Sequence, residues 1–316
     1  MAKFDKHTTA EEVSKLFADE IRGKTILITG VTKGGLGAEA ALALSLSHPK
    51  LLILAGRSLD KLLAVEKEIN SISPNVVTRR LLLDLSSLEK VRKAAAEVDT
   101  YAEPIDRLIN NAGIMAAPYS TTEDGIESQF GTNYVGPFLF TNLIMGRILA
   151  AGEGARIVNV SSDGHSIQQI RFEDYNFGNG ETYNKWKAYG QAKTGNILFS
   201  VALAEKVGGK GVRAYSLHPG MIMTNLGRYI TKGEMKNFGW LDESGNVNEG
   251  LWKSIQEGAA THVVAAFDPS ISDQNGAYLQ DCKVDMEACK PYAKDKNEAE
   301  RLWKLSESLV GQEFSY

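Results

Sequence analysis

Short runs of apolar residues alternate along the chain with longer stretches whose apolar residues recur every three or four positions. The short runs have the length of buried β-strands, and the longer stretches have the period of amphipathic helices. We predict strands over residues 25–29, 51–55, 76–83, 105–109, 155–160 and 212–217. We predict helices over residues 36–46, 59–69, 88–101, 125–149 and 188–207.

Apolar strands separated by helices are typical of a parallel sheet that is covered on both faces. The expected fold is therefore α/β, a single Rossmann-type, doubly wound parallel sheet with helices on both faces. Because no repeat or linker divides the chain, we expect an N-terminal arm over residues 1–22 and one domain over residues 23–316. The alternation lapses over residues 225–257, after the sixth strand. We interpret this insertion as a substrate lid at the ligand-binding end of the sheet.

The composition narrows the range of partners. Hydrophobic residues make up 43% of the chain and charged residues 23%, with a net charge of −4 and no long basic run. Neither nucleic acid nor an anionic membrane surface is therefore an expected partner. No apolar stretch reaches the ~18 residues of a membrane span, and residues 1–23 lack the apolar core of a signal peptide, so we expect a cytoplasmic protein. Cys282 and Cys289 are expected to be reduced and are too few for a zinc site, so no metal is expected.

A glycine-rich turn, residues 29–37, joins the first predicted strand to the first predicted helix. Glycines allow a tight turn and a close approach of the backbone, and a helix N-terminus offers free N–H groups to phosphates. A plain βα turn is the alternative, and the glycine spacing is not the common one. Its place after the first strand favours a dinucleotide pyrophosphate. The residues expected to bind it are Gly30, Thr32, Lys33, Gly35, Leu36 and Gly37.

The end of the second strand, residues 55–58, indicates which cofactor is preferred. A carboxylate at this point would bind the ribose diol of NAD(H) and repel a 2′-phosphate, but none is present. Arg57 instead offers a planar, charged group suited to phosphate, and Lys33 is a second candidate cation. The alternative is that both are solvated surface cations. We predict that NADP(H) is preferred over NAD(H).

A Tyr-x-x-x-Lys sequence occurs twice, as Tyr183…Lys187 and as Tyr189…Lys193. Tyr183 follows a loop-like segment and precedes the predicted helix. Tyr189 and Lys193 lie within the helical pattern, share one face at i and i+4, and are separated by small residues that allow a flat ligand to approach. We therefore favour the second pair.

Hydride transfer to a carbonyl group develops negative charge on its oxygen, so a proton donor must lie within hydrogen-bond reach. We expect the Lys193 ammonium and an oxidised nicotinamide to favour tyrosinate and to lower the pKa of Tyr189 from about 10 to roughly 7–9. Lys193 is also expected to bind the nicotinamide ribose. Ser162 follows the fifth strand at the edge of the sheet where ligands bind, so its hydroxyl is expected to bind the substrate oxygen.

Together these features resemble the short-chain dehydrogenase/reductase family. The resemblance implies an adenine contact at Asp84 and Leu85, and a catalytic role in a proton relay for Asn133 beside Ser162, Tyr189 and Lys193. It also implies cofactor contacts at the NNAG sequence that ends strand four and at the PG sequence after strand six, through Asn111, Ala112, Gly113, Pro219, Gly220, Ile222 and Thr224.

A narrower resemblance is to the retinol-dehydrogenase-like branch of this family. Ser162 and Tyr189 are 27 positions apart (189 − 162), wider than in much of the family, and residues 161–174, 276–282 and 302–307 resemble that branch. The resemblance implies a lipophilic carbonyl or secondary alcohol as substrate, and a homodimer or homotetramer. His165 lies near the site and is expected to shape the loop rather than to transfer protons.

The leading hypothesis is an NADPH-dependent carbonyl reductase. A non-catalytic NADP(H)-binding sensor or docking module is the alternative, since folds of this type carry many functions. Epimerases and dehydratases acting on nucleotide sugars share the Tyr/Lys pair, but they usually carry a larger C-terminal substrate domain than the residues after Thr224 provide.

Overall fold

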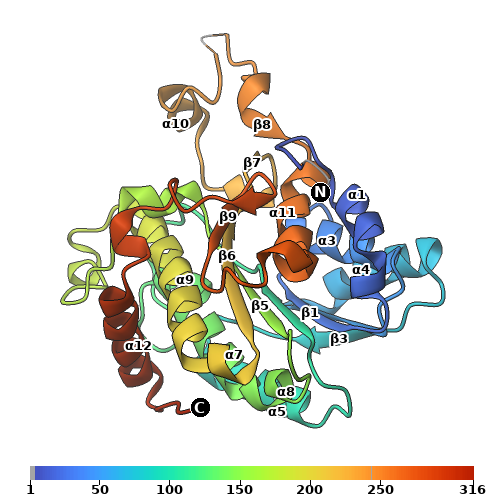
Figure 1. Ribbon diagram of the computed structural model, residues 1–316. Helices are drawn as coiled ribbons and strands as arrows, with labels where there is room; N and C mark the ends of the chain where they lie inside the picture. The colour runs from blue at the N-terminus through green and yellow to red at the C-terminus, as the bar shows by residue number, and fades with distance from the viewer. Residues whose placement is uncertain (1–3, 243) are drawn as a thin grey trace.

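The computed structural model of the chain describes residues 4–242 and 244–316, and an eight-stranded sheet lies at its centre (Figure 1). The strand order is β10-β9-β6-β5-β4-β1-β2-β3, and every strand is parallel to its neighbours except β10. The six predicted strands are confirmed as β1 to β6, whereas β9 and β10 were not predicted. The bounds are β1 Thr25–Thr29, β2 Leu51–Gly56, β3 Thr78–Leu82, β4 Arg107–Asn110, β5 Arg156–Val160, β6 Arg213–His218, β9 Tyr278–Gln280 and β10 Lys283–Val284.

Two hydrophobic cores lie on the two faces of this sheet. In β1 the side chain of Leu27 enters one core, while Ile26 and Ile28 enter the other, because successive residues of a strand point to opposite faces. The first core includes residues of α5, α7, α9 and α12, and the second includes residues of α1, α3, α4 and α11. The expected doubly wound α/β fold is confirmed. The bounds are α1 Ala10–Leu16, α2 Ala18–Ile21, α3 Leu36–Ser45, α4 Leu59–Ile72, α5 Leu88–Asp99, α9 Lys185–Val207, α11 Ile255–Phe267 and α12 Lys296–Val310.

The helix predicted over residues 125–149 is not continuous. It consists of α6 (Ser128–Phe130), the π-helical turn η1 (Gly131–Val135), α7 (Gly136–Leu143) and α8 (Met145–Leu149). Pro137 has no N–H, so it cannot donate to the carbonyl of Asn133 four residues earlier. The apolar period continues across this point, and for that reason the sequence pattern alone did not reveal the break.

The N-terminal segment packs on the domain. Ala10 and Val13 of α1 are fully buried against the core that contains α3 and α11. His7 adds a contact between its Nδ1 and Oε1 of Glu257, 3.0 Å apart, near the start of α11. Residues 4–22 of the expected arm therefore contribute to the core.

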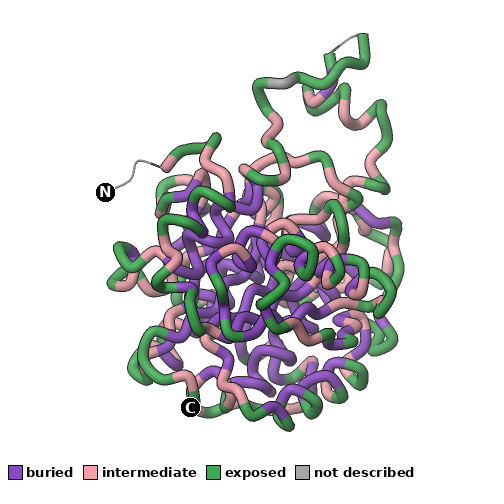
Figure 2. The backbone as a smooth tube through the Cα atoms, turned by 90° about the vertical axis from the view of Figure 1, so that its right-hand side faces the viewer, coloured by how far each residue is buried: buried purple, intermediate pink, exposed green. Residues whose placement is uncertain are grey.

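The insertion after β6 projects from the body of the molecule (Figure 1). Its two ends pair as short parallel strands, β7 (Met221–Ile222) and β8 (Trp252–Lys253), and it carries the helix α10 (Lys232–Asn237). Most of its described residues are exposed (Figure 2). Within the described parts of the chain, no helix has the length and apolar character needed to cross a membrane.

Candidate active site

Most of the predicted site residues follow the carboxyl ends of β1, β2, β4, β5 and β6, whereas Asn133, Tyr189 and Lys193 lie on helices and Asp84 and Leu85 follow β3. These strands are neighbours in one parallel sheet, so their carboxyl ends lie along the same edge. From β1 the chain adds β2 and β3 on one side, and it then returns to add β4, β5 and β6 on the other side of β1. A crevice for ligands forms at such a switch point. The topology therefore brings the glycine turn, the NNAG sequence, Ser162 and the PG sequence to one edge of the sheet.

The glycine turn is joined to the NNAG sequence. Asn111 donates from Nδ2 to the carbonyl of Thr29 at 2.8 Å, and Thr29 Oγ1 accepts from the backbone N–H groups of Asn111 and Ala112 at 3.0 Å each. Gly30 has φ +73°, and a Cβ on it would lie 2.6 Å from Cα of Ala112. A Cβ on Gly37 would lie 2.5 Å from Nδ2 of Asn111. Only glycine fits at these two positions, because the loop that follows β4 packs directly against them.

The N-terminus of α3 is suited to an anion. Gly35 is the N-cap residue and Leu36 begins the helix, and no side chain caps it. The first N–H groups of the helix therefore keep their capacity to donate to a phosphate. Gly258 of α11 packs here, since a Cβ on it would lie 2.6 Å from Cγ1 of Ile222 and 2.9 Å from Cδ2 of Leu36. Ile222 of the PG sequence is thereby held beside the glycine turn.

The two candidate cations differ in their surroundings. Arg57 is exposed, and no described residue forms a hydrogen bond or ion pair with its guanidinium. Lys33 is also exposed, but its Nζ lies 3.4 Å from Oε2 of Glu68. Burial raises the pKa of Asp84, but hydrogen bonds from Ser86 and the positive charges of Arg57 and Lys90 outweigh this effect and lower it. Arg57 is therefore the better candidate of the two for a phosphate.

Ser162 and Tyr189 are brought together by two glycines. A Cβ on Gly164 would lie 2.8 Å from Cε1 of Tyr189 and 3.4 Å from Oγ of Ser162. A Cβ on Gly190 would lie 2.7 Å from the carbonyl oxygen of Gly164. The small residue after Tyr189 thus allows the Ser162 loop to approach α9. The sequence reasoning had assigned that space to a flat ligand.

Lys193 is 4% exposed and Tyr189 is 5% exposed. Lys193 donates from Nζ to the carbonyl of Val160 at 2.8 Å, and its Nζ lies 5.6 Å from the centroid of the Tyr189 ring. An ammonium has three N–H groups, so two remain for ribose hydroxyls. The glycine turn, the uncapped helix, Arg57 and this lysine together fit a pyridine dinucleotide.

The protein groups around Tyr189 act against the expected lowering of its pKa. Burial raises the pKa of Tyr189 to about 12, although the Ser162 hydroxyl acts in the opposite direction. Burial also lowers the pKa of Lys193 to about 7. The low-polarity surroundings disfavour the charged form of both groups, so the two side chains alone do not give the tyrosinate near neutral pH that the sequence analysis expected.

Asn133 lies within the π-helical turn η1, close to Lys193. Its side chain donates to and accepts from the backbone of Ile114, at 2.8 Å in each case. A Cβ on Gly113 would lie 3.2 Å from Oδ1 of Asn133 and 3.8 Å from Nζ of Lys193, so Gly113 lies between the two side chains. The amide of Asn133 is thus engaged, while its backbone carbonyl lacks the usual helical donor because Pro137 follows four residues later.

The PG sequence contacts the end of the insertion. Gly220 has φ +96°, and a Cβ on it would lie 2.7 Å from Cδ of Lys253. Lys253 forms an ion pair of 2.5 Å with Asp281 in the turn between β9 and β10. Pro219 precedes this contact, and Thr224 Oγ1 accepts from the N–H of Leu226 at 3.2 Å as the chain enters the insertion.

His262 was missed by sequence reasoning. It is fully buried in α11, and its Nε2 lies 3.3 Å from Oδ1 of Asn111. Burial lowers its pKa to about 4, so the imidazole is neutral and donates from Nε2 to the amide oxygen. A histidine in an apolar helix gives no signal in the sequence that it contacts the NNAG sequence. Among the described residues, no cluster of three or more His, Cys, Asp or Glu side chains is arranged to hold a metal ion.

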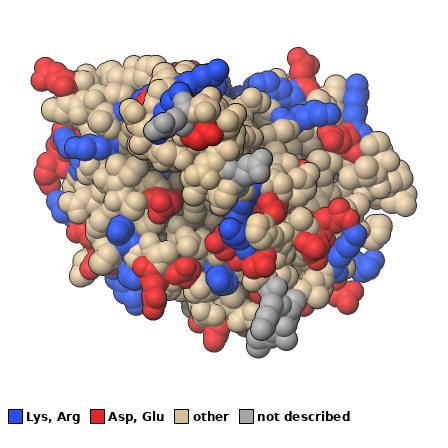
Figure 3. Space-filling model, turned by 90° about the horizontal axis from the view of Figure 1, so that it is seen from above, with Lys and Arg blue, Asp and Glu red and all other residues tan. Residues whose placement is uncertain are grey.

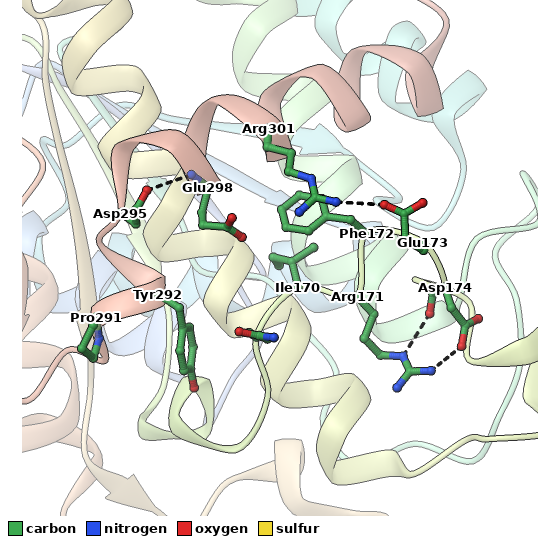
Figure 4. A pocket seen from close by; sticks show the side chains of 11 residues that line it. Ile170, Arg171, Phe172, Glu173, Asp174, Pro291, Tyr292, Asp295, Glu298 and Arg301 are labelled. Carbon is green, nitrogen blue, oxygen red and sulfur yellow. Dashed lines mark hydrogen bonds and ion pairs between the residues drawn. The ribbon is translucent and has the colours of Figure 1, made fainter.

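The structure has two cavities with different linings. One cavity has a volume of about 460 Å³ and is lined by Pro118, Tyr119 and Tyr183, with Tyr229 from the insertion. A larger groove of about 610 Å³ lies between residues 169–174 and the start of α12 (Figure 4), and none of the predicted site residues lines it. On the face shown in Figure 3, acidic and basic side chains of the described residues are interspersed.

The comparisons with known proteins identify one family. The family described as short chain dehydrogenase matches residues 24–235. Human retinol dehydrogenase 13 is 37% identical over 300 residues, which cover 93% of this chain and 86% of the relative. The chloroplastic short-chain dehydrogenase TIC 32 A of Brassica napus is 37% identical over 314 residues, covering 96% of this chain and 93% of that protein.

Solved structures show the same fold. An uncharacterised protein from Mycobacterium paratuberculosis has a TM-score of 0.71 and 32% identity, covering 95% of this chain and 98% of that one. NADPH-bound carbonyl reductase from chicken fatty liver has a TM-score of 0.60 and 22% identity, with 84% of this chain and 99% of that one covered. The chain therefore belongs to the short-chain dehydrogenase family, in its retinol-dehydrogenase-like branch, and is an oxidoreductase of alcohol and carbonyl groups.

Proposed function

We propose that the protein reduces a lipophilic ketone or aldehyde with NADPH, or oxidises the corresponding secondary alcohol in reverse. The observation that supports this proposal most directly is the group formed by the partly exposed Ser162 and the buried Tyr189 and Lys193 at the carboxyl edge of the sheet. A proton donor, a second hydroxyl and a lysine amine lie there within one crevice, and carbonyl reduction requires a donor at the oxygen that gains charge.

Each side chain has a distinct role in the proposed reaction. The Ser162 hydroxyl binds the substrate carbonyl oxygen, and Tyr189 donates its phenolic proton to that oxygen. Lys193 holds the nicotinamide ribose through the N–H groups that Val160 does not use. The nicotinamide supplies the hydride in its reduced form and a positive charge that favours tyrosinate in its oxidised form. The carbonyl of Asn133 accepts from a water that returns a proton towards Lys193.

The proposed preference for NADPH is supported by the unpartnered guanidinium of Arg57 and by the absence of a carboxylate at residues 55–58. It is tested by the ratio of NADPH to NADH efficiency in three proteins. Arg57→Ala is expected to lower this ratio by roughly 10-fold or more, since a charge-assisted contact to phosphate is lost. Lys33→Ala, which removes a cation already paired with Glu68, serves as the matched control. Equal use of both cofactors by the wild type would reject the preference.

The proposed lipophilic substrate is supported by the cavity beside Tyr183 and by the likeness to retinol dehydrogenase 13. Aromatic rings supply large apolar area, and each 100 Å² buried contributes about 2.5 kcal/mol. Tyr229 in its wall comes from residues 225–257, so we propose that this segment is a substrate lid. The cytoplasmic location, and a homodimer or homotetramer, stay predictions.

The decisive experiment is NADPH oxidation with a panel of hydrophobic ketones and aldehydes of increasing chain length. We expect turnover that increases in efficiency with apolar length and that Tyr189→Phe abolishes. NADPH binding without turnover on any carbonyl, in a protein that binds a macromolecular partner, would instead favour a non-catalytic sensor or docking module.

A further inference from the structure

His165 is a fully buried histidine that the proposed reaction does not use. It lies in the short 3₁₀ helix η2 (Asp163–Ile167), which Ser162 caps. Ser162 Oγ accepts from the N–H of Gly164 at 3.1 Å. The carbonyl oxygen of Ser162 lies 2.7 Å from Nδ1 of His165 and 3.1 Å from its backbone nitrogen. One histidine therefore contacts the backbone of the serine twice.

The second ring nitrogen decides which tautomer is present. Nε2 of His165 lies 3.2 Å from the backbone nitrogen of Lys290, and a backbone N–H can only donate. Nε2 is thus the acceptor and Nδ1 carries the hydrogen, which is donated to Ser162. Burial lowers the pKa of His165, in agreement with a neutral ring. Both nitrogens are engaged, so the ring has no free position for proton transfer to a substrate.

The backbone of His165 extends these contacts to two other elements. Its carbonyl accepts from the hydroxyl of Tyr292 at 2.8 Å and from Oγ1 of Thr194 at 3.2 Å. Thr194 lies on α9 directly after Lys193. Tyr292 and Lys290 lie in the segment before α12, and Tyr292 lines the groove shown in Figure 4. His165 thus joins the Ser162 loop both to the helix that carries Tyr189 and to a segment more than 120 residues away.

We infer that His165 is a positioning residue, which directs the Ser162 hydroxyl towards Tyr189 and the substrate oxygen by holding the Ser162 carbonyl between α9 and the segment around Lys290. This inference rests on the proposed function, because the reaction gives the Ser162 hydroxyl its role. The Ser162 hydroxyl accepts from the N–H of Gly164 in the same short helix, so a movement of this helix that frees the Ser162 carbonyl also removes the donor that holds the hydroxyl. A shift of about 1 Å in such a group can cost on the order of 100-fold in rate.

Three substitutions at His165 separate the two ring contacts. In His165→Asn the side-chain amide nitrogen takes the position of Nδ1 and can still donate to the Ser162 carbonyl. In His165→Gln the longer side chain puts its amide at the position of Nε2, so the Ser162 carbonyl loses its side-chain donor. We expect kcat of His165→Asn within about 3-fold of wild type, and kcat of His165→Gln and His165→Ala lower by roughly 10- to 100-fold, with little change in the dissociation constant of NADPH. Equal losses in His165→Asn and His165→Gln would overturn the inference.

A double-mutant cycle distinguishes positioning of Ser162 from a general structural role. If His165 acts through the Ser162 hydroxyl, His165→Ala lowers kcat in the wild type and has no further effect in Ser162→Ala. Equal factors in both backgrounds, or no loss in either, would overturn the inference. Thermal unfolding of each variant shows whether it is folded. If His165→Ala does not fold, the comparison of His165→Asn with His165→Gln still tests the inference.

A readout without turnover keeps this inference separate from the proposed function. The crystal structures of His165→Asn and His165→Gln are compared with that of the wild type. We expect the distance between Ser162 Oγ and Tyr189 Oη to be retained in His165→Asn and to lengthen in His165→Gln. If the distance is unchanged in both variants, the role of His165 is overturned, whether or not the wild type is active on carbonyl substrates. A wild type inactive on every carbonyl, with the distance changed as expected, contradicts the proposed function alone.

Discussion

The two Tyr-x-x-x-Lys sequences at the start of α9 have the same spacing but very different surroundings. Tyr189 and Lys193 lie inside the helix and are almost fully buried. Tyr183 lies before the N-cap residue, and Lys187 is exposed in the first turn. The i, i+4 rule that places two side chains on one helical face applies only to the second pair, because Tyr183 is not part of the helix.

The tyrosine of the first pair is held by hydrogen bonds and lines a cavity. Tyr183 donates from its hydroxyl to the carbonyl of Ala117 at 2.7 Å and accepts from Nε2 of Gln129 at 2.9 Å, so its phenol is engaged by the body of the protein. It lines the cavity of about 460 Å³. Between Tyr183 and Lys187, Lys185 and Trp186 contact the insertion. The two pairs have the same spacing, so burial and hydrogen-bond partners are what distinguish them.

The largest expected effect is the loss of the Tyr189 hydroxyl. Tyr189→Phe removes the proposed proton donor and keeps the ring, so we expect kcat to fall by roughly 10²- to 10⁴-fold. Tyr183→Phe is the matched change in the first pair, and we expect its kcat to stay within a few-fold of wild type. Steady-state kinetics on one ketone measure both, and NADPH fluorescence titration checks that binding is kept. Comparable losses in the two variants would contradict the assignment of the second pair.

A smaller but still large effect is expected at the lysines. Lys193→Met removes the amine that donates to Val160 and is proposed to hold the ribose, so we expect kcat/KM to fall by roughly 10- to 100-fold and NADPH binding to weaken. The free energy of unfolding should change little, because burial already disfavours the ammonium. Lys187→Met at the exposed position of the first pair should change neither quantity. A large loss in Lys187→Met would show that the lysine has been assigned wrongly.

The pH dependence follows from the raised pKa of Tyr189. A phenol with a pKa of about 12 stays protonated between pH 6 and 9, so the rate of ketone reduction should be level over this range with respect to Tyr189. Alcohol oxidation needs the tyrosinate, whose fraction rises about tenfold per pH unit below its pKa, so the oxidation rate should increase with pH. Tyr183→Phe should keep both profiles. A reduction rate that falls from pH 6 to 8 would indicate a Tyr189 that loses its proton near neutrality.

The strands β1 to β6, and the place of Tyr189 and Lys193 within a helix, could be predicted from the sequence because these features are local. Apolar runs define the strands, and small neighbours mark Tyr189. The helix α11 was not predicted because it has no polar face: Gly258–Phe267 is buried throughout, so its apolar residues show no helical period. The strands β9 and β10, of three and two residues, are too short to be recognised in a pattern. The place of β9 in the sheet depends on pairing with β6, which is not local, and β10 pairs in turn with β9.

The contacts of the site were harder to predict than its members. Nothing near His262 in the chain indicates that it reaches Asn111, 151 residues earlier. The pKa of Tyr189 was predicted from the charges of Lys193 and the oxidised nicotinamide, without the opposing effect of burial in the folded chain. Gly190 was assigned to ligand contact, yet it admits the loop of Ser162. In each case the missing information was the burial or contact that distant segments create on folding.

The smallest expected effect concerns the residues between the two pairs. Trp186 donates from Nε1 to Oε1 of Glu234 on α10 at 3.2 Å, and its ring lies 5.0 Å from that of Phe238. Trp186→Ala removes both contacts with the proposed lid, so we expect KM for a long-chain ketone to rise several-fold, with kcat within about twofold. Lys187→Ala, one position later and exposed, is the matched control.

Glu234→Gln tests the polar part of this contact by itself. It weakens the ion pair with Lys185, whose Nζ lies 2.7 Å from Oε1 of Glu234, and keeps the ring contacts of Trp186. A partly exposed ion pair contributes about 1 kcal/mol at most, so KM should rise no more than about fivefold and less than in Trp186→Ala. If KM of a short-chain ketone rises as much as that of a long-chain ketone, the segment does not bind the apolar part of the substrate. In that case Lys185 and Trp186 at the start of α9 would hold the insertion in place without contributing to substrate binding.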